Sequence, residues 1–293
     1  VNQTCKNFSV IVVDDGSTDS TKTKIDPYLE KLDIKYYYKK NSGVSDSRNF
    51  GIKKVNTPYF LFLDSDDLVS PNLIETIDKY TKYDVLSFQS VKVDEKGNTI
   101  NHLNKKTYDS TNGEQFLKAL MKKKSYFFLA PWGYVFNSKF WKDNDFKFSK
   151  NYIMEDSGLI PLVLLRANNI ISIDLYGYYY IQTNESIMRT NNDAKIKLKN
   201  ESILYQYDNL MNELSKIKLD KNFKRIFDDY FAGWLLWYGT TLNKEYLPNY
   251  MKEIEKRNIY KKFKKNSIKV ITKIIMCKIN YNLYFKLYNF VHR

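Results

Sequence analysis

The sequence predicts an α/β fold with a mostly parallel sheet flanked by helices, followed by a helical C-terminal extension. Three observations lead to this prediction. Short β-branched apolar segments alternate with helix-forming segments up to about residue 100, as in parallel sheets with crossover helices. Carboxylates directly follow two of these apolar segments, at the edge where open α/β sheets bind their ligands. After residue 191 only long helical stretches remain, so we expect one domain over residues 1–190 and a helical region over 191–293.

The elements of the first region are predicted from apolar runs and turn residues. Phe8–Asp15 is a β-branched run that ends in two carboxylates, as a buried strand does where it leaves a sheet. Pro27 should shorten the next helix, and Pro71 suits the first turn of a later one. In order, we expect strands at 8–15, 34–38, 59–63 and 84–93, and helices at 21–32, 44–55 and 71–80.

The second region is predicted as long helices with a basic tail. The helices span Ala194–Leu214, Asn222–Leu242 and Glu245–Ile259. Eleven of the 47 Lys and Arg residues, and none of the 33 Asp and Glu residues, lie after Glu255. From residue 256 on, lysines alternate with Ile, Phe, Tyr and Leu, which predicts a segment that lies on an anionic membrane surface. The alternative is a helix packed on the body, with its lysines merely solvated.

Composition excludes several classes of protein. With 43% hydrophobic and 27% charged residues, the chain is globular rather than disordered. Cys5 and Cys277 lie at opposite ends, which excludes a disulfide framework and favours a reducing, cytoplasmic compartment. With only two histidines, a Ser-His-Asp or Cys-His mechanism has almost no candidates. No apolar run is long enough to predict a membrane-spanning helix.

The segment Asp64-Ser65-Asp66-Asp67, directly after an apolar strand, is the most informative motif. Carboxylates two residues apart at a strand end can face one side, and such oxygen ligands suit Mg²⁺ or Mn²⁺. A metal there would neutralise a diphosphate leaving group. The alternative is an acidic turn that caps the helix beginning at Pro71.

Two further segments lie on the same side of the predicted sheet. Asp14 and Asp15 end the first strand, and they either accept hydrogen bonds from a base and a ribose or cap a helix. Arg48 follows the loop that contains Asn41 and Gly43. Its guanidinium can bind phosphate oxygens in a bidentate manner, although an Arg on a helix is usually at the surface.

The fourth segment is Glu155-Asp156, which precedes the apolar run Leu159–Leu165. A carboxylate that enters an apolar helix can act as a general base whose pKa is tuned by partial burial. The structural alternative is that both charges simply favour the N-terminal end of the helix dipole.

Taken in this order and spacing, the four segments resemble the family 2 glycosyltransferases, which have the GT-A fold. The resemblance covers residues 1–190, and it implies an inverting, metal-dependent hexosyltransferase. The donor would be a nucleotide-sugar, usually a UDP-sugar, with Mn²⁺ or Mg²⁺ as the cofactor. Similarity to the bacterial capsule, exopolysaccharide and wall-glycan enzymes implies a glycan or lipid-linked acceptor at the inner face of the cell membrane.

The resemblance also implies a role for each matching residue of the donor site. Asp15 would bind the uracil N–H while Asp14 supports its turn, and Arg48 would face the nucleotide or its phosphates. Asp64 would bind the ribose and sugar, and Asp67 would assist the sugar or structure the loop. The implied donor set is Asp14, Asp15, Asn41, Gly43, Arg48, Asp64, Asp67, Ser186 and Arg189.

For the reaction itself, the resemblance implies that Asp66, with Asp64, binds the metal. Asp156, with Glu155 beside it, would be the general base that deprotonates the acceptor. Trp132 would stack on an acceptor sugar, or else be a buried Trp at a domain seam.

One departure from the family concerns the N-terminal end of the sequence. Gln3–Phe8 matches the segment that in the family follows a first strand and helix. That strand normally lies between the strand ending at Asp15 and the strand ending at Leu63. We therefore expect an N-terminally incomplete domain with two exposed sheet edges.

The motifs of other protein classes fit this sequence less well. A haloacid-dehalogenase-type phosphohydrolase needs an Asp-x-Asp near its first strand, and Asp14-Asp15-Gly16 lacks that spacing. A P-loop motif is absent from the sequence, and a nucleic-acid binder would need basic clusters in the body as well as the tail. The strongest alternative is a truncated, catalytically inactive transferase homologue that acts as a binding or partner subunit.

Overall fold

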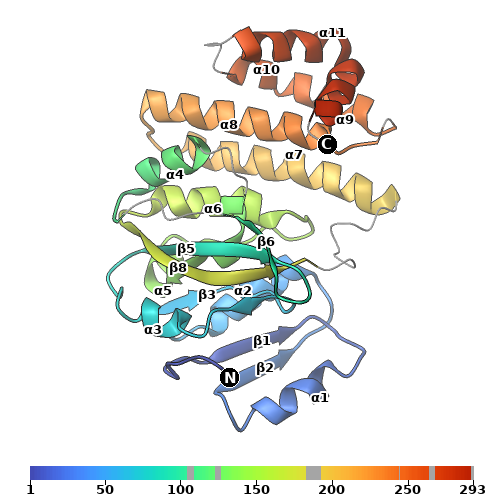
Figure 1. Ribbon diagram of the computed structural model, residues 1–293. Coiled ribbons are helices and arrows are strands. Elements are labelled where there is room, and N and C mark those ends of the chain that lie inside the picture. Colours follow the sequence, from blue (N-terminus) through green and yellow to red (C-terminus); the bar gives the residue numbers. More distant parts are fainter. Residues whose placement is uncertain (104–108, 123–126, 183–192, 244, 264–267, 292–293) are drawn as a thin grey trace. The chain divides into compact units, whose positions relative to one another are not determined.

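A computed structural model describes residues 1–103, 109–122, 127–182, 193–243, 245–263 and 268–291 (Figure 1). The chain forms two compact units. The first comprises Val1–Leu120 and Phe127–Leu214, and the second comprises Ser215–Arg293 with the segment that begins at Met121. Helix α7 (Asp193–Ser215) lies almost entirely within the first of these units.

A small parallel sheet forms one part of the first unit. It contains β1 (Val10–Asp14) and β2 (Ile34–Tyr38), with Val10 opposite Ile34 and Asp14 opposite Tyr38. The connection contains α1 (Thr21–Ile25), which is short because Pro27 follows it in a 3-10 turn. Helix α2 (Val44–Lys54) packs against β1.

The larger sheet has six strands and mixed pairing. In the order β3-β7-β5-β8-β4, with β6 beside β5, only β5 and β8 are parallel neighbours. The α/β class is confirmed, but the sheet is less parallel than predicted because β7 inserts antiparallel between β3 and β5. The strands are β3 (Tyr59–Leu61), β4 (Leu68–Val69), β5 (Val85–Val93), β6 (Thr99–His102), β7 (Tyr134–Asn137) and β8 (Ile170–Ile181).

Helices cover this sheet, and the most buried of them is α6 (Glu155–Arg166). It lies between the sheet and α7 (Figure 1), and every residue from Ser157 to Leu165 is buried. The segment just before α6 bonds to α7, since the Ile153 amide donates to Ser202 Oγ at 3.1 Å. The other helices are α3 (Leu73–Ile77), α4 (Gly113–Lys122) and α5 (Ser138–Asp143).

Aromatic side chains fill the core beneath the end of β3. Phe60, Phe62, Phe136, Trp141 and Phe148 form one cluster, with ring centroids 4.9 to 6.0 Å apart. Such edge-to-face and tilted pairs contribute about 0.5–1.5 kcal/mol each beyond the area that they bury. This cluster fixes the strand from which the Asp64–Asp67 loop leaves the sheet.

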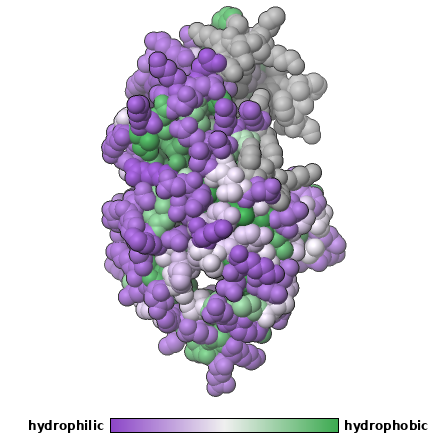
Figure 2. All heavy atoms as spheres, turned by 90° about the vertical axis from the view of Figure 1, so that its left-hand side faces the viewer, coloured by the Kyte–Doolittle hydropathy of each residue, from purple (hydrophilic) through white to green (hydrophobic). Residues whose placement is uncertain are grey.

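β1 and β3 each have one edge without a strand partner among the described residues. β1 pairs only with β2, and β3 pairs only with β7. β1 is only half-buried despite its apolar sequence. Figure 2 shows an opening in the lower part of the surface, at about the height of β1 and β3 in Figure 1.

The second unit is helical, as predicted. Its longest helices are α8 (Lys221–Gly239) and α11 (Ile268–Val291), and α9 (Leu247–Lys256) and α10 (Ile259–Lys262) lie between them in sequence. Asp220 caps α8 by accepting from the Asn222 and Phe223 amides. None of the described helices combines the length and the hydropathy that crossing a membrane would require.

Candidate functional site

The predicted motifs meet in the first unit. Asp14 ends β1, the Asp64–Asp67 loop follows β3, and Glu155 and Asp156 begin α6. Arg48 of α2 bonds to both of the latter segments. Segments far apart in the sequence therefore supply one polar site.

Asp14 is a buried carboxylate that fixes the turn after β1. It accepts from the Ser17 amide at 2.7 Å and from the Tyr36 hydroxyl at 2.5 Å. The Tyr36 bond, aided by the backbone, lowers the pKa of Asp14 despite its burial. The same bond raises the pKa of Tyr36 to about 12. Asp14 therefore supports the turn as an ionised acceptor.

Asp15 connects that turn to the loop before α2. Its carboxylate accepts from Lys39 Nζ, from the Ser42 amide at 2.9 Å and from the Gly43 amide at 2.7 Å. Partial burial disfavours the charge, but Lys39 and the two backbone donors outweigh it, and the pKa of Asp15 is lowered. Asp15 is thus ionised, and it organises the neighbouring loop.

Two glycines allow this close approach of the loops. Gly16 and Gly43 have φ values of +84° and +90°, which favour glycine. A Cβ atom on Gly16 would lie only 2.8 Å from the Asn41 backbone nitrogen. The predicted donor residues Asn41 and Gly43 are therefore held beside Asp15.

Arg48 lies at the centre of the site and joins two of its acidic segments. Its Nη1 donates to Glu155 Oε1, and its Nη2 donates to Asp64 Oδ1 at 3.0 Å. The guanidinium also lies over the rings of Phe62 and Phe148, at 5.9 and 5.5 Å from the centroids. In the structure, the guanidinium of Arg48 therefore binds carboxylates of the protein itself. The family resemblance had implied that it faces the nucleotide or its phosphates.

The Asp64–Asp67 loop is anchored by Tyr178 of β8. Asp67 is buried and accepts from the Tyr178 hydroxyl at 2.6 Å and from the Ile181 amide at 2.8 Å. Burial raises the pKa of Asp67 to about 6, against the effect of these two donors. Of its two predicted roles, the structure favours the one that orders the loop, since both carboxylate oxygens bond to the protein.

Asp66 and Asp64 differ from Asp67 in being accessible. Asp66 is exposed, and no described residue binds its carboxylate, while the Asp64 side chain is 36% exposed and bonds to Arg48. Within the described residues, no three His, Cys, Asp or Glu side chains are grouped so as to hold a metal by themselves. Two carboxylates nevertheless fit Mg²⁺ or Mn²⁺, because such ions commonly use one or two protein carboxylates together with substrate phosphates.

Asp156 begins α6 as a half-buried carboxyl group. Its Oδ1 accepts from the Ser157 amide at 2.7 Å. Burial first and the charge of Glu155 second raise the pKa of Asp156 to about 7, while Arg48 opposes this shift. Met154, directly before the pair, has a left-handed φ of +57° that turns the chain into the helix. Asp156 thus has the proton affinity of a base that works near neutral pH.

Three predicted site residues remain, namely Trp132, Ser186 and Arg189. Trp132 is only 7% exposed and stacks on Tyr178, with centroids 4.5 Å apart. The ring is therefore part of the hydrophobic core, as the buried-Trp alternative expected. Ser186 and Arg189 lie outside the described residues.

Several residues that hold the site's loops in place were not predicted from the sequence. Lys39 bonds to Asp15, and Asn49 binds the backbone of Phe148 through both ends of its amide, at 2.8 and 2.9 Å. Tyr178, which anchors Asp67, was not predicted as a site residue. Its alternation with Tyr180 along a strand was the available signal, because every second side chain faces the same side of a sheet.

Removing the Tyr178 hydroxyl tests the anchor of the loop. Tyr178→Phe should destabilise the protein by about 2 kcal/mol at pH 8, because the bond to an ionised carboxylate is lost. At pH 5, below the pKa of about 6 of Asp67, the carboxyl group is protonated, so the loss should be smaller. Chemical denaturation at both pH values measures this, with Tyr38→Phe, at an exposed position, as the control. Equal losses at both pH values would contradict the anchor.

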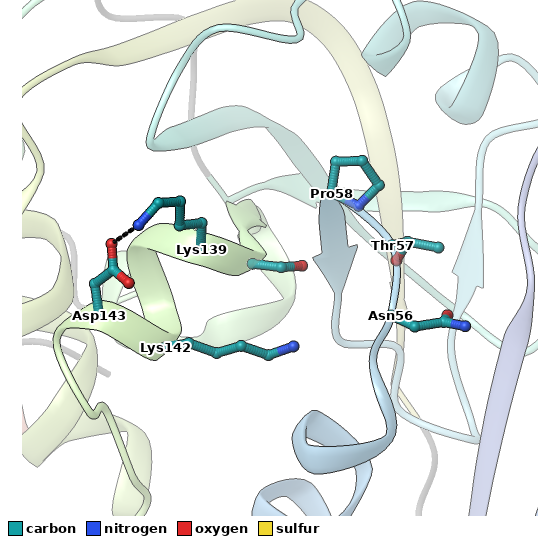
Figure 3. A pocket seen from close by; sticks show the side chains of 7 residues that line it. Asn56, Thr57, Pro58, Lys139, Lys142 and Asp143 are labelled. Atoms are coloured by element: carbon teal, nitrogen blue, oxygen red, sulfur yellow. Dashed lines mark hydrogen bonds and ion pairs between the residues drawn. The ribbon is translucent and has the colours of Figure 1, made fainter.

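A pocket lies away from these groups, at the opposite end of β3. It has a volume of about 370 Å³ and is lined by Asn56, Thr57, Pro58, Ser138, Lys139, Lys142 and Asp143 (Figure 3). Its one carboxylate, Asp143, pairs with Lys139 at 2.5 Å. The pocket precedes β3 whereas the acidic loop follows it, so it is no part of the candidate site.

The sequence matches a known family and several curated proteins. Residues 1–142 match the family described as glycosyl transferase family 2. Rickettsia proteins named uncharacterized glycosyltransferases are 36% to 39% identical over 101 to 107 residues, and the match spans 16% to 32% of their length. The cholesterol galactosyltransferase of Borreliella burgdorferi is 22% identical over 293 aligned residues, covering 94% of this chain and 77% of that protein.

Two solved structures show the same fold. Residues 1–349 of Staphylococcus aureus TarS, solved with UDP-GlcNAc, match with a TM-score of 0.74 and 18% identity over 98% of this chain and 85% of that one. The mannosyltransferase PcManGT of Pyrobaculum calidifontis, solved with GDP-Man and Mn²⁺, matches with a TM-score of 0.53 and 13% identity, covering 98% and 76% of the two chains. The predicted GT-A fold is thereby confirmed.

Proposed function

We propose that this chain, whose residues 1–142 match glycosyl transferase family 2, transfers a hexose from a UDP-sugar to a glycan or lipid-linked acceptor, with inversion at the anomeric carbon. The UDP-GlcNAc bound by TarS supports a UDP-sugar as the donor. The sterol acceptor in the name of the Borreliella relative supports a lipid-linked acceptor. A role in capsule, exopolysaccharide or wall-glycan synthesis is part of the same proposal.

The observation that carries the proposal is the junction at Arg48. This one side chain bonds to Asp64 of the donor-side loop and to Glu155, the neighbour of Asp156. The carboxylate that we propose for the metal and the neighbour of the proposed base, whose pKa is raised, are thereby linked through one side chain. A displacement reaction needs this arrangement, because the leaving group and the attacking group lie on opposite faces of the sugar.

In the proposed reaction, the acceptor hydroxyl oxygen attacks the anomeric carbon while the bond to the diphosphate oxygen breaks. Asp156 takes the hydroxyl proton, and its raised pKa suits this step near neutral pH. Asp66 and Asp64 would hold Mn²⁺ or Mg²⁺, which supplies positive charge to the departing diphosphate. The Mn²⁺ in the PcManGT structure supports this use of a metal. Arg48 keeps the two carboxylate segments in place.

A panel of nucleotide-sugars tests the donor. Thermal denaturation of the full chain with Mn²⁺ should show a higher melting temperature with UDP-sugars, since a ligand that binds the folded state stabilises it. GDP- and ADP-sugars should raise it less. An equal effect of all nucleotide-sugars, or none, would contradict the proposed donor class.

Glu155→Gln separates the two carboxylates that begin α6. The charge of Glu155 raises the pKa of Asp156, so removing it should move the acid limb of the pH profile of kcat/KM to lower pH, by about one unit. Gln can still accept from Arg48. Asp143→Asn, outside the site, is the control. Loss of activity at every pH would instead assign the base to Glu155.

A further inference from the structure

Helix α11 has apolar side chains on two sides, and only one side is packed. Ile274, Cys277 and Phe285 are buried, and a Cβ atom added to Gly239 of α8 would lie 3.0 Å from the Phe285 ring. This side therefore joins α11 to the second unit. A helix that is apolar on both sides is normally covered on both.

The other side exposes its aliphatic residues. Ile275, Ile279 and Leu283 are 49%, 81% and 50% exposed. Ile279 is the most exposed large apolar side chain in the described part of the chain. Ile275 and Ile279 are one helical turn apart and so share a face. We call Ile275, Ile279 and Leu283 the aliphatic surface.

The charged residues of α11 are all basic. Lys278 and Lys286 are exposed on the same helix, and no acidic residue follows Glu255 in the sequence. The Lys278 ammonium lies 5.6 Å from the centre of the Tyr260 ring, which fixes its position. An occupant of this surface must therefore be apolar and negatively charged at once.

The backbone of α11 suits a segment that lies flat. Asn280 is non-helical, with φ −153° and ψ 87°, and its side chain accepts from the Leu283 amide at 3.0 Å. The helix is therefore divided into two short segments, the second capped by Asn280. Short basic segments with exposed aliphatic side chains can lie at a bilayer interface, with the aliphatic groups toward the acyl chains and the lysines at the headgroups.

We propose that the aliphatic surface of α11, with Lys278 and Lys286, docks on an anionic phospholipid bilayer at the inner face of the cell membrane. Acidic lipids supply both properties that the surface requires. Each lysine near such a surface strengthens binding about fivefold. Docking does not depend on the reaction, but for the proposed function it brings the site to lipid-linked acceptors.

The test is sedimentation of the full chain with vesicles, without any donor. Wild-type protein should pellet with phosphatidylcholine–phosphatidylglycerol vesicles, less so at high salt, and stay in solution with phosphatidylcholine alone. The double variant Ile275→Asn/Ile279→Asn should bind at least about tenfold more weakly, because two aliphatic side chains that would enter the bilayer are lost. Lys278→Gln/Lys286→Gln should lose about as much.

Two control variants make the same kinds of substitution, aliphatic to Asn and Lys to Gln, outside α11. Leu29→Asn alters an aliphatic side chain that is 45% exposed, and Lys22→Gln/Lys24→Gln alters exposed lysines of α1. Both should bind like wild type, and unchanged melting temperatures show that all variants are folded. Equal binding of the α11 variants and the controls would overturn the proposal. A dimer in solution that Ile275→Asn/Ile279→Asn dissociates would assign the surface to a second copy instead.

Discussion

Replacing Asp156 by Asn is expected to lower the rate of sugar transfer by about a hundredfold to ten-thousandfold, the usual contribution of a general base. The amide cannot take a proton from the acceptor hydroxyl. Its oxygen can still accept from the Ser157 amide, as Asp156 does at 2.7 Å, so the start of α6 should remain in place. Donor binding should therefore survive the change.

The measurement compares turnover and donor binding in the same preparation. UDP affinity in the presence of Mn²⁺ should match wild type, while kcat falls. Asp143→Asn, whose carboxylate pairs with Lys139 outside the site, should leave both unchanged. A variant that keeps most of its turnover would remove Asp156 from the role of base.

Replacing Asp66 by Ala is expected to weaken UDP binding in the presence of Mn²⁺ by about a hundredfold, since the ion contributes several kcal/mol of charge stabilisation. The exposed carboxylate of Asp66 has no partner among the described residues, so the fold should not depend on it. A chelator should weaken UDP binding to wild-type protein to a similar degree. It should have little further effect on the variant.

Calorimetric titration with UDP, with Mn²⁺ and with chelator, measures this. Asp78→Ala removes an exposed carboxylate just after α3 and serves as the control. If wild-type protein binds UDP equally well in both conditions, the assignment of Asp66 and Asp64 to the metal fails.

Apolar runs and proline positions in the sequence correctly predicted several strands and helices, because these elements depend mainly on residues close in sequence. β2 spans Ile34–Tyr38 as expected, and Pro27 shortens α1. α3 is shorter than expected, and the mixed pairing of the larger sheet was not predicted. The antiparallel insertion of β7 between β3 and β5 depends on contacts between residues about fifty positions or more apart. The local sequence of each strand does not specify which distant strand it pairs with.

Contacts between residues distant in sequence were also not predicted at the candidate site. The spacing of the carboxylates identified Asp64, Asp66 and Asp156 as candidates. It did not identify their partners, because Arg48 and Glu155 are 107 positions apart and Tyr178 and Asp67 are 111 apart. The family resemblance implied that Arg48 faces the nucleotide or its phosphates, and in the structure its donors bond to Glu155 and Asp64.

Release of UDP from a UDP-sugar tests the central claim most directly, because it needs the donor site, the metal and the leaving-group chemistry together. The full chain with Mn²⁺ should release UDP over many turnovers, through transfer to an acceptor or slowly to water. Chelator, Asp66→Ala and Asp156→Asn should each reduce the rate. No release of UDP, together with no binding of UDP, would contradict the account and leave a catalytically inactive homologue.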